Sequence, residues 1–146
     1  MKLRNNSILL LFLIVTFSAL GQSFTELSGP FGGRVSTLRY DGVNNRLYAA
    51  VNYKLFRSTD NGVNWSPITV PTDIIQVLDI LIDGSKIIIT GNNKFSSSTD
   101  NGANWTTLPI PISDGLAYQI VKHPTAGVYI LRANARVLVT LDNGLN

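Results

Sequence analysis

The sequence contains no cysteine and only one histidine among its 146 residues. Without cysteine the chain can form no disulfide framework, no thiolate nucleophile and no cysteine-ligated metal site. A single histidine also supplies too few ligands for a zinc centre. We therefore expect neither a metal nor a cofactor.

Charge is scarce as well, because charged residues make up only 14% of the chain against 45% apolar residues. This balance is typical of a folded chain rather than a disordered one. The formal charge of +3 includes Lys2 and Arg4, which lie in a segment that we expect to be removed. The remaining ten basic and nine acidic residues leave +1, and the basic residues are scattered. This pattern does not indicate a nucleic-acid or anionic-membrane surface.

The chain also lacks an apolar run long enough to span a membrane. Its longest uncharged apolar stretch, Ile8–Leu20, has 13 residues, whereas a bilayer requires about 20. Basic residues precede this stretch, and the small residues Ala19 and Gly21 stand near its end. This layout predicts a helical signal peptide over residues 1–21 that is cleaved on export. We expect the mature protein to be secreted or to reside in the cell envelope, without a membrane span.

One eight-residue motif occurs twice. "STDNGVNW" covers Ser58–Trp65 and "STDNGANW" covers Ser98–Trp105, 40 residues later. A partial third copy, "TLDNGLN", covers Thr140–Asn146. Apolar runs and polar turns recur in the same order before each copy. A period of this length indicates a repeat architecture.

The apolar pattern within each repeat is that of short β-strands. Five- and six-residue β-rich runs are bounded by Gly, Asn and Asp, and no apolar helical period is sustained outside residues 1–21. The first repeat predicts four strands, at Val35–Tyr40, Arg46–Val51, Lys54–Arg57 and Trp65–Val70. Four strands in about forty residues favour an all-β propeller of four-stranded antiparallel blades over a sandwich or barrel. Ile87–Ile89 is apolar at successive positions, which predicts a strand covered on both faces.

The motif Ser-x-Asp-x-Gly-x-x-Trp resembles the Asp-box, also called the bacterial neuraminidase repeat. Sialidase-like, sortilin-like, xyloglucan-cleaving and photosystem II assembly-factor propellers carry this motif, so it points to a fold rather than an activity. The resemblance implies a structural turn on the blade rim, where Asp accepts hydrogen bonds from its own turn, Gly supplies a permissive backbone and Trp caps the blade. The implied structural residues are Ser58, Asp60, Gly62, Trp65, Ser98, Asp100, Gly102, Trp105, Thr140, Asp142 and Gly144.

The repeats divide the mature chain into four segments. "FTELSGP" at the front resembles "WSPITVP" from Trp65, so Phe24–Leu27 is predicted to be the outer strand of a closing blade. About three blades are too few for a closed ring. The chain is therefore expected to be an N-terminal fragment of a longer propeller, or alternatively a short chain that forms a ring with other copies. The predicted segments are residues 22–33 (outer strand), 34–73 (first blade), 74–113 (second blade) and 114–146 (third blade without its outer strand).

No catalytic residue emerges from this pattern. His123 lies at a predicted turn, and Asp79 is expected to point outward from a strand. The resemblance to sialidases would require a Tyr–Glu pair, but Glu26 is the only glutamate and falls in the predicted outer strand. Arg34 is expected to lie in a loop at the axial mouth of the propeller.

The sequence therefore predicts an exported, non-catalytic propeller that binds a protein or a carbohydrate through its blade-connecting loops. We also expect self-association through unpaired blade edges. The alternative is a fragment of a secreted glycoside hydrolase, of sialidase or xyloglucanase type, whose catalytic residues lie mostly in other blades. The predicted contact residues are Arg34, Tyr53, Asn92, Asn93 and Asn134.

Overall fold

The computed structural model describes residues 26–27, 29–30, 33–111, 115–124 and 127–142. The predicted signal peptide, Phe24 and Gly144 lie outside these ranges. Over the described residues every regular element is a β-strand, and none of them forms a helix with the length and apolarity needed to span a membrane.

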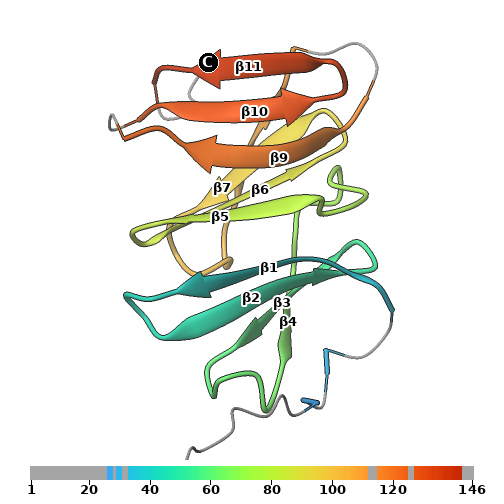
Figure 1. Ribbon diagram of the computed structural model, residues 1–146, viewed down its shortest axis with the longest axis vertical. Helices are drawn as coiled ribbons and strands as arrows, with labels where there is room; N and C mark the ends of the chain where they lie inside the picture. The colour runs from blue at the N-terminus through green and yellow to red at the C-terminus, as the bar shows by residue number, and fades with distance from the viewer. Residues whose placement is uncertain (1–25, 28, 31–32, 112–114, 125–126, 143–146) are drawn as a thin grey trace, which may run out of the picture.

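Eleven strands form three antiparallel sheets over the described ranges (Figure 1). The first sheet has the order β1-β2-β3-β4 and the second the order β5-β6-β7-β8, whereas the third contains β9, β10 and β11. The expected architecture of four-stranded antiparallel units is thereby confirmed. The strands are β1 (Val35–Asp41), β2 (Arg46–Val51), β3 (Lys54–Ser58), β4 (Ser66–Ile68), β5 (Asp79–Asp83), β6 (Lys86–Gly91), β7 (Lys94–Ser98), β8 (Thr106–Pro109), β9 (Ala117–Lys122), β10 (Tyr129–Ala133) and β11 (Arg136–Thr140).

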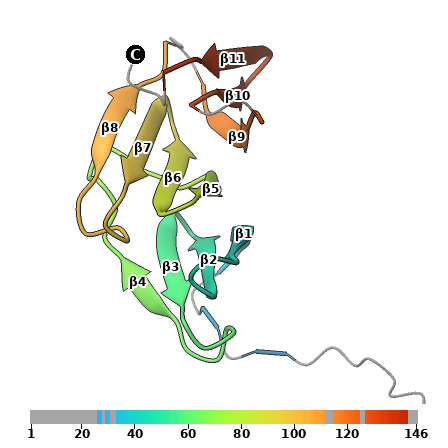
Figure 2. The same cartoon turned by 90° about the vertical axis from the view of Figure 1, so that its left-hand side faces the viewer.

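The three sheets stand side by side like blades, each beginning with an inner strand. β5 lies between β1 and β9 in Figure 1 and contacts both of them. Figure 2 shows β1 and β5 on one side of the molecule and the outer strands β4 and β8 on the other. Sequence segments about 40 residues apart thus meet along the inner strands.

The core consists of two apolar layers between neighbouring blades. One layer joins Tyr48 and Leu55 of the first blade to the second blade through Ile87 and Ile89. The other joins Ile88 to the third blade. Ile87, Ile88 and Ile89 are each at most 2% exposed, so the predicted burial of this strand on both faces is confirmed.

The predicted strands of the first repeat agree with the observed ones within one or two residues. The outer strand is the least regular, since β4 spans only Ser66–Ile68 where the pattern predicts Trp65–Val70. It starts late because Trp65 belongs to the preceding turn, where its indole donates a hydrogen bond to Gly62. Glu26 and Leu27, the described part of the predicted closing strand, are not assigned to any strand.

Candidate functional site

The repeated turn between the third and fourth strands of each blade is built by internal hydrogen bonds. Ser58 Oγ donates to Asp60 Oδ1 at 2.8 Å and accepts from the Gly62 amide at 2.8 Å. Asp60 also accepts from the backbone and side-chain amides of Asn64, at 2.8 and 2.7 Å. The indole of Trp65 donates to the Gly62 carbonyl at 2.9 Å, which closes the turn.

The second copy repeats these contacts with the same partners. Ser98 bonds Asp100 and the Gly102 amide at 2.8 Å each, and Asn104 donates twice to Asp100. The indole of Trp105 reaches across to the Thr69 carbonyl at 2.9 Å, so this turn also ties two blades together. In the third copy Thr140 Oγ1 donates to Asp142 Oδ1 at 2.7 Å, and Gly144 lies outside the described residues.

These contacts keep the turn carboxylates ionised. The backbone amide of Asn104, its side-chain amide and the Ser98 hydroxyl lower the pKa of Asp100 to about 2. The equivalent donors of Asn64 and Ser58 lower the pKa of Asp60. A carboxylate that is occupied by its own turn and has a depressed pKa is poorly suited to act as a general acid near neutral pH.

The turns between the second and third strands lie at the opposite end of each blade, beside the start of the inner strand. Asn52, Asn92 and Asn134 occupy the same position in these turns, with φ between 44° and 47°. Asn52 and Asn134 press against Gly33 and Gly115, where a Cβ would lie 2.0 Å from each amide nitrogen. Two of these Asn side chains therefore pack against the blade's own backbone.

An elongated groove runs along the inner strands from this end of the molecule. A cavity of about 530 Å³ opens beside Arg34, Asn52, Tyr53 and Gln76. A second cavity of about 390 Å³ continues past Thr37 and Arg39 to Asp79 and Gln119. Both are lined by Ser36, Leu78, Tyr118 and Arg132, and we call the two together the inner groove.

The structure brings only two of the five predicted contact residues into this groove, Arg34 and Tyr53. Asn92, Asn93 and Asn134 line neither cavity; the carbonyls of Asn92 and Asn93 accept the amides of Ala117 and Ile110, at 2.8 and 2.7 Å. Tyr118 and Arg132 line both cavities and were not among the predicted contact residues. Tyr118 occupies the same inner-strand position as Ser36 and Leu78, which also line the groove, and no motif in the sequence marks this position.

Asp79 lies at the bottom of the groove, where three blades meet. Its side chain is 3% exposed, so the expectation that it points outward is wrong. One carboxylate oxygen accepts from Thr37 at 3.0 Å and from Arg39 at 2.7 Å, and the other from the Ile120 amide at 3.0 Å. The outward orientation fails because these donors on β1 and β9 compensate the burial of the charge.

A second polar contact joins the second and third blades at the other end of the inner strands. Asp83 accepts hydrogen bonds from Lys122 and, at 2.8 Å, from the buried Tyr129 hydroxyl. Burial opposes ionisation of Asp83, but these donors outweigh it and lower its pKa, while burial and the Asp83 carboxylate raise the pKa of Tyr129 to about 12. His123 follows Lys122, at the opposite end of β9 from Tyr118, and its backbone amide donates to Val128.

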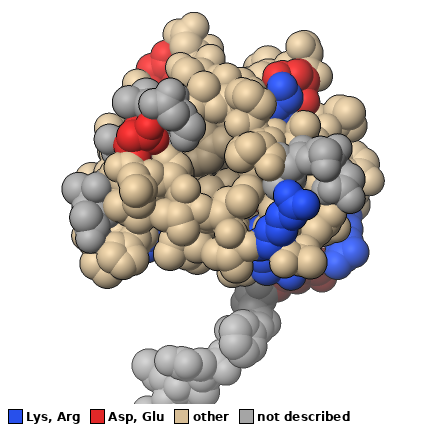
Figure 3. Space-filling model, turned by 90° about the horizontal axis from the view of Figure 1, so that it is seen from above, with Lys and Arg blue, Asp and Glu red and all other residues tan. Residues whose placement is uncertain are grey.

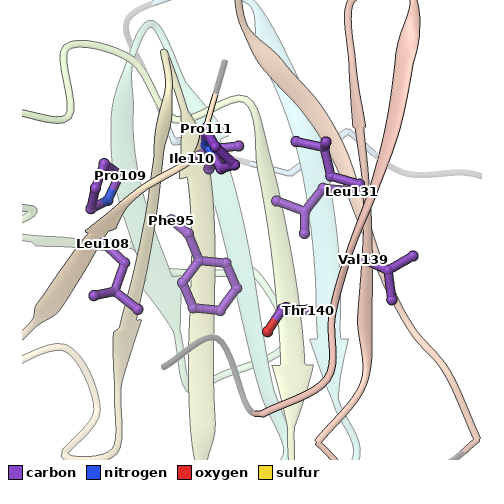
Figure 4. Close-up of a pocket in the computed structure, with 9 residues that line it drawn as sticks. Phe95, Leu108, Pro109, Ile110, Pro111, Leu131, Val139 and Thr140 are labelled. Carbon is purple, nitrogen blue, oxygen red and sulfur yellow. The ribbon is translucent and has the colours of Figure 1, made fainter. Parts of the chain in front are cut away.

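A smaller, apolar pocket of about 150 Å³ lies between the second and third blades, away from the inner strands (Figure 4). Leu108 and Pro109 from β8 and Thr140 from β11 line it. Between the first two blades Trp105 packs against the apolar core, and its indole donates to the Thr69 carbonyl. This pocket therefore belongs to the packing between blades, and it presents no titratable side chain.

Charged groups are sparse on the surface over the third blade, where Figure 3 shows mostly uncharged side chains. Within the described ranges no cluster of three or more His, Asp or Glu could hold a metal ion. The inner groove thus remains the place where polar, charged and aromatic side chains from three blades converge.

Residues 13–145 match the protein family described as DUF6242 beta propeller domain. No curated protein sequence matches the chain. One similar solved structure is described as YCF48 bound to D1 peptide; it is 23% identical, with a TM-score of 0.66 over 80% of this chain and 39% of its own. Another is an ancestral GH74 enzyme, 19% identical, with a TM-score of 0.64 over 77% of this chain and 18% of its own.

This chain therefore spans less than half the length of either solved structure. At these identities the likeness shows the fold alone, and with the family match it confirms the predicted β-propeller.

Proposed function

Because the chain belongs to the family of DUF6242 β-propeller domains, we propose that it is an exported, non-catalytic binding module that holds a partner in the inner groove. The observation that carries this proposal is the groove itself, since three blades contribute side chains to one elongated site. Sites that bind other molecules are concave and collect a few polar groups in this way. Export rests on the basic, apolar and small-residue pattern of residues 1–21.

A protein partner is favoured over a carbohydrate. The YCF48 structure contains a peptide, which is precedent for peptide binding on a propeller of this shape. Tyr53 and Tyr118 are 59% and 38% exposed in the groove, and exposed tyrosines are enriched where proteins bind partners.

The turns at Ser58–Trp65 and Ser98–Trp105 are proposed to be Asp-boxes with a structural role. Their hydrogen bonds run almost entirely within the turn, which supports this role. Binding is therefore assigned to the opposite end of the blades.

The alternative function is that of part of a glycoside hydrolase, and the GH74 enzyme among the similar structures favours it. Two carboxyl groups on either side of the scissile bond are the usual requirement for that chemistry. Asp79 is the one carboxylate that lines the groove within the described ranges, and three donors already occupy it. Any such activity would need carboxylates from elsewhere.

The proposal is tested by probing peptide and glycan arrays with the labelled 146-residue chain, together with the Tyr118→Ala variant. We expect binding to peptides that falls at least several-fold in the variant. Tyr40→Ala is the matched control, because Tyr40 is an exposed tyrosine at the other end of β1. Binding that Tyr40→Ala and Tyr118→Ala reduce equally would refute the groove as the site, and hydrolysis of xyloglucan would favour the alternative.

A further inference from the structure

We propose that the inner groove recognises an extended peptide segment with acidic side chains, and that Arg34 and Arg132 bind its carboxylates. This inference rests on the proposed binding function and adds the chemistry of the partner. It starts from the charges that line the groove.

The groove has an excess of positive charge. Arg34, Arg39 and Arg132 line it, against the single carboxylate of Asp79. Arg39 is paired with Asp79 at 2.7 Å, and these two charges cancel. Arg34 and Arg132 are exposed and take part in none of the ion pairs found in the described part of the chain. Two guanidinium groups are thus available to a ligand.

Arg132 is held in position by an aromatic ring. Its guanidinium carbon lies 5.2 Å from the centre of the Tyr118 ring, which is a cation–π contact. A stacked guanidinium loses less freedom on binding and keeps its edge open for a bidentate carboxylate. This contact explains how an exposed side chain can form a defined anion site.

The remaining polar lining offers both donors and acceptors. Ser36 already donates to the Ala50 carbonyl, and both oxygens of Asp79 are occupied. Gln76, Gln119 and the two tyrosines offer amide and hydroxyl groups along the groove. A peptide backbone presents one carbonyl acceptor and, except at proline, one amide donor per residue, and these side chains can pair with both. This lining suits a peptide backbone, and the two available guanidinium groups favour acidic side chains on that peptide over a neutral glycan.

The direct test is fluorescence titration of the full chain with an eight-residue peptide in which glutamate alternates with serine. Its glutamine–serine counterpart and an oligogalacturonate of equal charge are the comparison ligands. We expect the glutamate peptide to bind about ten-fold or more tightly than the glutamine peptide at low salt, because charged hydrogen bonds exceed neutral ones. High salt should reduce this difference, since the arginines are exposed.

Variants locate the interaction. Arg34→Gln and Arg132→Gln should each weaken glutamate-peptide binding about ten-fold, and Arg132→Lys should have an intermediate effect because it keeps the charge and loses the planar fork. Arg57→Gln is the control, since Arg57 lies on β3 outside both cavities. Unchanged thermal unfolding in each variant would show that the fold is intact.

Equal affinity for the glutamate and glutamine peptides, or an equal loss in Arg57→Gln, would overturn the inference. Tighter binding of oligogalacturonate would assign the groove to an acidic glycan and also overturn it. Array binding that depends on Tyr118 but not on either arginine would leave the proposed function standing while this inference fails. Absence of all array binding would count against the proposed function itself.

Discussion

The carboxylate of Asp79, on β5 of the second blade, links that blade to the first and the third. Thr37 and Arg39 donate to it from β1, and the amide of Ile120 donates from β9. A charge that is 3% exposed is tolerated only with such partners, because desolvation without hydrogen bonds is costly. Asp79 therefore acts as a polar link at the point where the inner strands converge.

Asp79→Ala should lower the free energy of unfolding by about 2–4 kcal/mol, because it leaves Thr37, Arg39 and a buried amide without their acceptor. Urea denaturation at neutral pH measures this change. Asp73→Ala is the control: that carboxylate is half exposed and 3.6 Å from Lys94, so its loss should change stability by less than about 0.5 kcal/mol. Equal effects of the two substitutions would contradict the linking role.

The titration of Asp100 gives a second prediction. Its pKa of about 2 lies below the ordinary value because the folded turn stabilises the carboxylate, chiefly through Asn104. The contribution to stability is therefore present above the unfolded-state pKa of about 3.9 and is lost as the pH falls toward 2. Carboxyl-carbon NMR should show Asp100 titrating near pH 2 and Asn104→Ala raising that value. Asp60 is the internal control, because its donors come from the other turn; a shift in both would argue against local control.

The role of a single residue could be predicted from the sequence when its hydrogen-bond partners are close to it in the sequence. The hydrogen bonds of Asp60 and Asp100 span two to four residues, so the letters of the motif sufficed to predict a structural turn. The partners of Asp79 lie 40 to 42 residues away, and nothing next to it in the sequence indicates them. Arg132 was missed for the same reason, since its stacking partner Tyr118 is on another strand.

At the scale of the elements, one contact recurs at the repeated turn. An apolar side chain from the preceding segment packs directly against the glycine of the turn. A Cβ on Gly102 would lie 2.5 Å from Ile68 Cγ2, and one on Gly62 would lie 2.9 Å from Leu27 Cδ1. Leu27 thus packs against the turn glycine of the first blade in the same way as Ile68 of β4 packs against the turn glycine of the second blade. Leu27 itself lies outside any strand, so the closing strand at Phe24–Leu27 stays a prediction.

Gly102→Ala should lower the free energy of unfolding by about 2–4 kcal/mol, through a strained φ of +86° and a clash with Ile68. Gly84→Ala is a matched control, since Gly84 also has a positive φ but no atom within 4 Å of an added Cβ. It should cost only about 1 kcal/mol. Thermal unfolding measures the loss of stability in both variants. The loss in Gly84→Ala reports backbone strain alone, and the additional loss in Gly102→Ala reports the clash with Ile68. Equal losses would show that the glycine is needed for its backbone alone.

Strands and turns were predictable because four apolar runs recur in register with the turn residues. The groove was harder to predict because it forms only where β1, β5 and β9 converge. Asn134 illustrates the difference: its place in a turn predicts ligand contact, yet its side chain fills the space over Gly115.

At the scale of the whole molecule, the first and third blades each expose one face. The equivalent face is buried in a blade that has a neighbour on that side. Leu38 on β1 is 53% exposed, whereas Ile80 at the equivalent position of β5 is fully buried against the first blade. On the third blade Val139 is 55% exposed and pairs with Ile130 on β10. The exposed face of the first blade and the exposed face of the third blade are equivalent to the two surfaces that meet where one blade packs on the next. Exposed apolar surface of this kind favours association between chains.

The chain should therefore self-associate in a concentration-dependent manner, and sedimentation velocity over a range of concentrations measures this. Val139→Lys should reduce the association, because it places a charge on the exposed face of β11. Val43→Lys is the control, since Val43 lies 81% exposed in a turn away from either face. A parent chain that stays monomeric at all concentrations would contradict this prediction.

The glycine contact between blades also bears on how such a gene can change in length. The same side-chain-and-glycine contact recurs from one blade to the next, so duplication or loss of a whole unit of about forty codons recreates it at the new junction. An insertion of one codon within the outer strand moves Ile68 or its counterpart to the opposite face, away from the glycine that it contacts. Selection on this contact therefore permits recombination in whole blades and disfavours insertions in the outer strand, while the turns can vary in length, as the spacings of 40 and 42 residues between motif copies show.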